Sequence, residues 1–347
     1  MKLTVEQREL DDKLSIVKEA VATKKTMPIL QGVFISGNQV VATDLELGIK
    51  TSLECEVAEK GAAVFPSRIF SIVKELPDSI IEITVDKNFK AKLECNGIEI
   101  ELDCYDYQEY PDLPKVEKPS IMTVNSHQLE KAIRNTKVAV LNDDSQPALT
   151  GIYFDDGNTV ATNTYRLAKY QSEIQFEESI ILPEKAAKAV ENICNTGEIK
   201  VEYSSNYVKF ILNDTTIFSR LIEGEFPNYP RVIPDESNTT ITLNTQSLKS
   251  CLKRAKTVDT DTGIIRLISV DDSLKVKLQA DNSQFEELLS AEVEGENQTI
   301  NLDISYLLDG VKLLQEDKTQ LELLDGVNPA VLREGNLTYL IMPIRSD

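Results

Sequence analysis

Basic side chains recur at a constant spacing along this chain. Lys18, Lys137 and Lys256 stand 119 positions apart, and each lies in a stretch rich in Lys and Arg. Together the three stretches hold twelve basic and five acidic side chains, although the whole chain holds 37 and 57. The stretches are residues 8–25, 126–140 and 246–257. Ammonium and guanidinium groups gathered on one surface can neutralise the phosphates of a polyanion.

The basic stretches allow two interpretations. In the first, they form a surface for phosphate contacts; in the second, they are the solvated charged faces of ordinary amphipathic helices. The chain contains no zinc finger or helix-turn-helix pattern, so sequence-specific base recognition is not expected. The candidate residues for such phosphate contacts are Lys18, Lys24, Lys25, Lys131, Arg134, Lys137, Lys249, Lys253, Arg254 and Lys256.

Residue types that carry catalysis are sparse. His127 is the only histidine, which excludes a multi-histidine metal site and weakens any Ser-His-Asp arrangement. Adjacent acids such as Asp143-Asp144 are expected among 57 acidic residues, and the chain has no phosphate-binding glycine motif. We therefore predict no catalytic residue, no metal site and no cofactor.

Bulk properties restrict the partners and the compartment. The net charge of −20 means that most of the surface repels nucleic acid and anionic membranes. Five cysteines without a CxxC pair indicate neither a disulfide framework nor a zinc site. Residues 1–12 are charged and no run of 18 apolar residues occurs, so we expect a cytoplasmic protein that does not enter membranes.

The spacing of 119 residues extends well beyond the lysines. It relates Thr4, Thr123 and Thr242, then Leu10, Leu129 and Leu248, then Ala42, Ala161 and Ala280. Between the first two copies it also relates Pro28 to Pro147, Val41 to Val160, Thr43 to Thr162 and Tyr110 to Tyr229. The chain is thus predicted to hold three similar domains, at residues 1–118, 119–236 and 237–347. Proline-bearing polar linkers are expected at 112–119 and 230–237.

Each repeat is expected to begin with a strand and an amphipathic helix. Apolar residues at helical spacing predict the first helices, and Asn125 and Asn244 stand where they can cap two of them. The stripes are Leu10, Leu14, Val17 and Val21; Leu129, Ala132, Ile133 and Val140; and Leu248, Cys251, Leu252 and Ala255.

A second helix is predicted in the middle of each repeat. Pro66 and Pro183 suit a first helical turn and Asp303 suits a cap. The stripes are Ile69, Ile72, Val73 and Leu76; Ala186, Ala189, Val190 and Ile193; and Leu307, Leu308, Val311 and Leu314.

Alternating segments such as 97–104 and 274–278 predict strands. The pairs Asn96-Gly97, Asp156-Gly157 and Asp325-Gly326 predict turns. The fold class is therefore α+β, with two helices on antiparallel sheet in each domain.

Three segments of the chain resemble one known family. Ala161-Thr-Asn-Thr-Tyr-Arg-Leu-Ala168, the FPNYPRVIP stretch within 220–234 and the closing Tyr339-Leu-Ile-Met-Pro-Ile-Arg345 are similar to segments of the bacterial DNA polymerase III beta subunits, the sliding clamps. The opening residues 1–6 and Met27-Pro-Ile-Leu30 also fit. The resemblance covers the whole chain.

The resemblance implies a non-enzymatic clamp that makes polymerases processive. Two chains of three domains would close head to tail into a ring around duplex DNA, with helices lining the hole and sheets outside. The implied partners are duplex DNA without sequence preference, the DNA polymerase III catalytic subunit, the clamp loader and other proteins with a clamp-binding motif. Topological retention lets individual phosphate contacts stay weak enough for sliding.

The family also implies a pocket between the second and third domains for a short glutamine- and leucine-bearing peptide. The implied pocket residues are Leu149, Thr162, Thr164, Tyr165, Arg166, Leu167, Pro227, Arg231, Val232, Leu340 and Met342. Thr164-Tyr165 replaces the Gly-His of the family pattern, and the chain ends in Ser346-Asp347 where the family has leucine. Both departures concern peptide preference. Several of the apolar members could instead belong to the core.

For the dimer contact, the candidate residues lie on an alternating strand and at a helix end. They are Ile100 and Leu102, opposed by Thr257 and Val258. Two other functions remain as alternatives. One is a repeat-built scaffold that binds partner peptides without encircling DNA, and the other, which lacks a convergent nucleophile and base, is a hydrolase.

Overall fold

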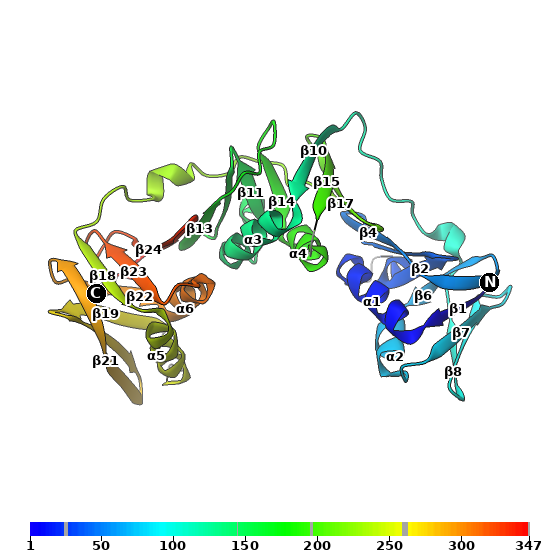
Figure 1. Ribbon diagram of the computed structural model, residues 1–347, viewed down its shortest axis with the longest axis horizontal. Coiled ribbons are helices and arrows are strands. Elements are labelled where there is room, and N and C mark those ends of the chain that lie inside the picture. Colours follow the sequence, from blue (N-terminus) through cyan, green and yellow to red (C-terminus); the bar gives the residue numbers. More distant parts are fainter. Residues whose placement is uncertain (24–26, 144, 195–196, 259–262, 346–347) are drawn as a thin grey trace. The chain divides into compact units, whose positions relative to one another are not determined.

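The computed structural model describes residues 1–23, 27–143, 145–194, 197–258 and 263–345 (Figure 1). Lys24, Lys25 and the two C-terminal residues Ser346 and Asp347 lie outside the described residues. The chain divides into two compact units. The first holds residues 1–130 and 185–221, and the second holds residues 131–184 and 222–347.

The first unit contains a five-stranded and an eight-stranded antiparallel sheet. The five-stranded sheet has the order β5 (Cys55–Glu59), β1 (Lys2–Glu6), β7 (Ile80–Val85), β8 (Lys90–Cys95) and β9 (Ile98–Asp103). The eight-stranded sheet has the order β10 (Ser120–Asn125), β15 (Glu198–Tyr203), β16 (Tyr207–Leu212), β17 (Thr215–Arg220), β4 (Leu47–Ser52), β3 (Gln39–Thr43), β2 (Gly32–Ser36) and β6 (Ala62–Pro66).

The second unit is built on one twelve-stranded antiparallel sheet. Its order is β14 (Ile180–Pro183), β11 (Gly151–Asp155), β12 (Asn158–Thr162), β13 (Arg166–Gln171), β25 (Leu337–Ile341), β24 (Ala330–Glu334), β23 (Lys318–Leu323), β18 (Thr239–Asn244), β21 (Ser283–Gly295), β20 (Ser273–Ala280), β19 (Ile264–Val270) and β22 (Thr299–Asp303). The middle repeat therefore shares one sheet with the first repeat, through β17 and β4, and another with the third, through β13 and β25.

The first helices of the repeats are α1 (Gln7–Val17), α3 (Ser126–Thr136) and α5 (Thr245–Val258). Their predicted stripes are buried, apart from the half-buried Val21. Val21 and Val140 lie beyond the helix ends, after the 3₁₀ turns η1 (Lys18–Ala20) and η4 (Lys137–Ala139). Both predicted caps are confirmed. Asn125 Oδ1 accepts the N–H of His127 at 3.1 Å, and Asn244 Oδ1 accepts the N–H of Ser247 at 2.8 Å.

The second helices are α2 (Ile69–Glu75), α4 (Glu184–Ile193) and α6 (Ile304–Leu313). The prediction that Pro66 and Pro183 open helices is wrong, because they end β6 and β14. Both strands are sheet edges, where a residue without an N–H costs no ladder hydrogen bond. The cap at Asp303 is confirmed, since its Oδ1 accepts the N–H groups of Ser305 at 2.8 Å and Tyr306 at 2.9 Å.

The predicted strands and two of the turns are also confirmed. Segments 97–104 and 274–278 correspond to β9 and part of β20. Asn96-Gly97 and Asp156-Gly157 both have positive φ at the two residues, the geometry of a tight hairpin turn. Asp325-Gly326 instead lies in the longer loop between β23 and β24, where the Asp325 carboxylate accepts the Val327 N–H at 2.8 Å.

The helices cover one side of the sheets and close the cores. In the first unit α1 packs against α2 and against β3 and β4. In the second unit α5 packs against α6 and lies on β18, β20 and β21 (Figure 1). Leu10 and Leu248, at equivalent repeat positions, are fully buried in these layers. The segment that joins the second and third repeats packs on the opposite face of the twelve-stranded sheet, through Tyr229.

Candidate functional site

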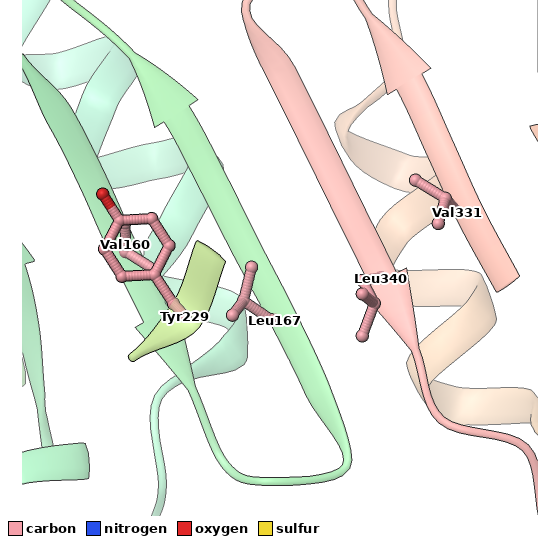
Figure 2. Packing of buried hydrophobic residues seen from close by; sticks show 5 residues of the cluster. All are labelled: Val160, Leu167, Tyr229, Val331 and Leu340. Carbon is pink, nitrogen blue, oxygen red and sulfur yellow. The ribbon is translucent and has the colours of Figure 1, made fainter. Parts of the chain in front are cut away.

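An apolar cluster lies where β13 of the second repeat pairs with β25 of the third. Leu167 faces Leu340 across this pair, and Leu340 in turn faces Val331 on β24. Directly opposed residues share one face of a sheet, so these side chains form a continuous floor. Val160 on β12 and Tyr229 from the short helix η6 (Tyr229–Val232) complete the cluster (Figure 2).

Aromatic contacts fix the segment that crosses this floor. The ring of Phe226 stacks on Tyr153 with centroids 4.5 Å apart, and Tyr229 meets Tyr153 edge to face at 6.4 Å. The Tyr229 hydroxyl donates to Asp155 Oδ2 at 3.3 Å. Burial, together with the Asp155 carboxylate, raises the pKa of Tyr229 to about 12. Segment 226–233 is therefore held in place by β11 and β12.

Exposed apolar side chains lie at the rim of this floor. Tyr165 is 63% exposed, Val232 48% and Met342 37%. The Met342 N–H donates to the Tyr165 carbonyl at 2.8 Å, which joins the end of β25 to the turn between β12 and β13. Thr164, Pro227 and Arg231 are also exposed. Exposed apolar groups beside a buried apolar floor are typical of a protein-binding surface.

The predicted pocket residues thus fall into three groups. Tyr165, Val232, Met342 and the exposed polar and proline residues form the rim. Leu167 and Leu340 form the floor and are only 2% exposed. Thr162, directly opposite Leu167 across β12 and β13, lies on the same face and belongs with this buried group, and Leu149, in η5 (Pro147–Leu149), is also buried.

Arg166 forms the third group, because adjacent strand residues point to opposite faces of a sheet. Its side chain lies on the helix-covered face, where Nη1 donates to Asp309 Oδ2 on α6 at 2.9 Å. The guanidinium also stacks 4.3 Å from the centroid of the Tyr306 ring. Among the described residues none accepts a hydrogen bond from its buried Nε. The structure therefore places Arg166 beneath the floor rather than beside it.

The charge of Arg166 is balanced by Asp309. Burial alone would raise the pKa of this carboxyl, but hydrogen bonds from Arg166 and Lys312 hold it below its ordinary value. Tyr339, whose pKa is raised by burial, adds a long contact of 3.5 Å from Arg166 Nη1 to its hydroxyl. An ionised pair thus joins β13 of the second repeat to α6 of the third.

The turn at the rim is held by its own side chains. Thr162 Oγ1 donates to the Arg166 carbonyl at 2.7 Å, and Asn163 Oδ1 accepts the N–H groups of Tyr165 at 3.1 Å and Arg166 at 3.0 Å. Thr164 has a φ of 75°, a conformation that strains a β-branched residue. The departure from the glycine of the family pattern therefore puts strain at the rim.

The side chains of the candidate DNA-facing residues on α5 point to two different sides of the helix. Lys249, Lys253 and Lys256 follow each other at four- and three-residue intervals, which places them along one helix face. Lys253 and Lys256 are exposed, and Lys256 Nζ donates to Ser305 Oγ at 3.0 Å. Arg254 points elsewhere, because its Nε donates to Glu287 Oε2 on β21 at 3.0 Å.

The remaining basic candidates belong to the first two repeats. Lys18 is exposed at the end of α1, whereas Lys131, Arg134 and Lys137 are half-buried. Lys131 and Arg134 line a cavity of about 320 Å³ together with acidic residues that include Glu316. The sequence did not indicate the nearby carboxylates, because they come from a distant part of the chain.

Two of the candidate dimer residues lie on a sheet edge and two lie at a helix end. Ile100 and Leu102 belong to β9, the edge strand of the five-stranded sheet, with Leu102 buried. Val258 ends α5, and its carbonyl accepts a hydrogen bond from Ser283 Oγ at 3.1 Å. Segment 283–290 of β21, which the sequence did not suggest as a contact, pairs with β20 on one side, while β18 pairs only with 291–295.

None of the helices in the described ranges is long and apolar enough to span a membrane.

Three segments of the chain match the models of three domains of one protein family. Residues 1–114 match the N-terminal domain of the DNA polymerase III beta subunit, residues 123–228 its central domain and residues 230–345 its C-terminal domain. These matches cover nearly the whole chain.

Individual relatives agree with the family match. The beta sliding clamp of Synechocystis sp. is 28% identical over 390 residues, which cover 99% of each chain. A solved sliding clamp from Bartonella birtlesii, bound to griselimycin, is 27% identical, with a TM-score of 0.92 and full coverage of both chains. The beta subunit from Thermotoga maritima is 25% identical, again with a TM-score of 0.92 and full coverage.

The predicted α+β architecture is confirmed as the three-domain clamp fold. The chain belongs to the family of DNA polymerase III beta subunits, the sliding clamps, which are non-catalytic processivity factors with DNA and polymerase as partners.

Proposed function

We propose that two copies of this chain close head to tail into a ring around duplex DNA and tether partner proteins through the surface over Leu167 and Leu340. Each copy contributes three domains, at residues 1–118, 119–236 and 237–347. The observation that carries the peptide site is the exposed apolar rim of Tyr165, Val232 and Met342 beside a buried apolar floor.

A short glutamine- and leucine-bearing peptide suits this surface. A leucine side chain gains about 1.5–3 kcal/mol when it leaves water for an apolar site. The exposed side chains of Thr164 and Arg231 can bond the peptide backbone or an amide side chain, whereas the N–H groups of Thr164 and Tyr165 are already bonded within the turn. Because Tyr165 is bulky and exposed, it restricts which residue can follow the leucine.

Contact with DNA rests on the basic face of α5. Lys249, Lys253 and Lys256 present three ammonium groups along one face, whereas Arg254 is neutralised by Glu287. Lysine contacts to phosphates carry no base information and weaken with salt, which suits sliding. We include Lys18, Lys131, Arg134 and Lys137 in the DNA-facing set as the equivalent elements of the other repeats.

The ring contact is proposed between two sheet edges. β9, with Ile100 and Leu102, offers one unpaired edge, and segment 283–290 of β21 offers another beside Thr257 and Val258. Leu288, on that segment, is 60% exposed. Pairing of β9 from one copy with β21 of the next would cover both edges, and a heterologous contact of this kind closes a ring when the rotation fits.

The proposed partners are the DNA polymerase III catalytic subunit, the clamp loader and other proteins with a clamp-binding motif. They would compete for the same rim, since they would all bind the surface over Leu167 and Leu340. The proposed compartment is the cytoplasm, where the bacterial chromosome is replicated.

Fluorescence polarisation of a labelled glutamine- and leucine-bearing pentapeptide tests the peptide site. The wild-type chain should give saturable binding, and Val232→Asp and Met342→Asp should each weaken it at least tenfold. Lys253→Glu, on α5, serves as the matched charge-changing control and should leave the Kd unchanged. Equal affinity in the wild type and in Val232→Asp would contradict the assignment.

A further inference from the structure

The repeat places a counterpart of the peptide surface between the first and second domains. The offset of 119 residues relates Val41 to Val160, Gly48 to Leu167 and Leu113 to Val232. Strand pairing is equivalent as well, because Gly48 on β4 faces Phe218 on β17 just as Leu167 faces Leu340. All the residues of this counterpart belong to the first compact unit.

The turns at the two surfaces are built alike. Thr43 Oγ1 donates to the Leu47 carbonyl at 3.0 Å, and Asp44 Oδ1 accepts the N–H groups of Glu46 at 3.1 Å and Leu47 at 2.8 Å. Leu45 has a φ of 79° and is 51% exposed. The equivalent Thr164 has a φ of 75° and is exposed as well. These bonds repeat those of Thr162 and Asn163 one for one, so the first junction has the same turn, with Glu46 and Arg220 at the positions of Tyr165 and Met342.

The floor differs at a single strand position. Gly48 has no side chain, and a β-carbon placed on it would overlap the Cδ2 methyl of Leu113. Leu113 therefore fills the space that the Leu167 side chain occupies in the second repeat. Beneath and beside it lie Phe218 and Val41, which are 2% and 8% exposed.

The linking segment is fixed just before Leu113. The Tyr110 hydroxyl accepts the Thr43 N–H at 3.0 Å, and its ring stacks on Phe34 with centroids 5.7 Å apart. The Tyr110 ring thus packs on Phe34 as the Tyr229 ring packs on the equivalent Tyr153, while the two hydroxyls have different partners. The three-residue step from this anchor brings Leu113 down onto Gly48, whereas the same step from Tyr229 leaves Val232 48% exposed.

We propose that the junction of the first two domains is a second surface for a leucine-bearing peptide, kept closed by the chain's own Leu113. This inference rests on the peptide site proposed above. At the first junction the linker carries the leucine (Leu113) and the strand carries a glycine (Gly48). At the second junction the strand carries the leucine (Leu167), and the linker residue Val232 stays exposed. A linker leucine seated in the floor leaves no room for a partner's leucine, so each chain presents one open site.

Leu113→Ser tests the closure, because a serine side chain gains little from the apolar floor and does not fill it. Isothermal titration with the glutamine- and leucine-bearing pentapeptide should give one peptide per chain for the wild type and two for Leu113→Ser. Lys115→Ser, an exposed position in the same segment, should remain at one. Leu113→Ala provides a milder variant if Leu113→Ser unfolds, as judged by circular dichroism.

A background that lacks the open site separates the two proposals. At peptide concentrations near the wild-type Kd, Val232→Asp should show little binding, because its affinity is at least tenfold weaker. Leu113→Ser/Val232→Asp should bind one peptide there, with photo-crosslinks from the peptide mapping to β4 and β17. A folded Leu113→Ser chain that still binds one peptide, and none in the Val232→Asp background, overturns the closed site. If the wild type binds no peptide but Leu113→Ser does, the open site is overturned and the closed site is retained.

Discussion

The guanidinium of Arg166 lies 2.9 Å from the carboxylate of Asp309, and this contact joins a strand of the second repeat to a helix of the third. The Arg166 side chain is 9% exposed and that of Asp309 is 32% exposed. Arg166 also ends the turn that carries Tyr165, so the ion pair lies directly beneath the rim of the peptide surface. The position of the rim therefore depends on a buried charge that Asp309 balances.

Asp309→Ala should lower the free energy of unfolding by about 2–4 kcal/mol, because it leaves the buried Arg166 cation without its partner. Denaturant unfolding followed by circular dichroism measures this change. Lys312→Ala is the matched control, since Lys312 bonds the same carboxylate at 3.0 Å from an exposed position and should cost less than about 1 kcal/mol. Equal costs for the two variants would show that Arg166 does not need Asp309.

The same ion pair predicts a pH dependence. The folded-state pKa of Asp309 is lowered, so its contribution is present in full above the unfolded-state value, about 4, and is lost as the pH falls through the lower folded-state value. The difference in unfolding free energy between the wild type and Asp309→Asn should therefore be constant from about pH 7 to 5 and shrink below about pH 4. A difference that grows on acidification would reverse the assigned sign.

Thr164→Gly should stabilise the chain, because glycine adopts the positive φ of this turn without strain. The expected gain is about 1 kcal/mol, the cost of a non-glycine residue in the left-handed region. Thermal unfolding detects it as a higher Tm. Leu45→Gly, at the equivalent turn of the first repeat, should give a gain of similar sign. A lower Tm for both variants would mean that the Thr164 and Leu45 side chains stabilise the fold by more than their positive φ angles cost.

Lys253 and Arg254 are adjacent but should differ in their effect on DNA. Lys253 is exposed on the basic face of α5, whereas Arg254 is paired with Glu287. Lys253→Ala should reduce the slope of log affinity for linear duplex against log salt by about 0.9, the change for one lost phosphate contact. Arg254→Ala should leave the slope nearly unchanged. The opposite ranking would place Arg254 against DNA and Lys253 away from it.

Regular local patterns allowed most elements of this fold to be predicted. The stripe of Leu248, Cys251, Leu252 and Ala255 and the caps at Asn244 and Asp303 depend on neighbours three or four residues away. Pro66 was misassigned because its tolerance depends on β6 being a sheet edge, a property of the tertiary fold.

The parts of the site that could not be predicted depend on partners that are distant in sequence. Arg166 was expected beside the peptide, but Asp309, 143 residues away, holds it on the opposite face of the sheet. Arg254 likewise meets Glu287 on β21, a contact that helix spacing does not indicate. Nothing in the sequence singles out Gly48, because its close contact with Leu113 depends on the tertiary fold.

Retention on DNA of different topology tests the central claim most directly. The labelled chain would be loaded by a clamp loader onto a nicked circular plasmid, washed at high salt, and compared before and after a restriction enzyme linearises the circle. A ring that encircles DNA should remain on the circle and leave from the linear ends, while Leu288→Arg, on the proposed ring contact, should not be retained on either. Equal retention on circular and linear DNA, or retention that vanishes with salt on both, would contradict encirclement and favour a scaffold that binds peptides without a ring.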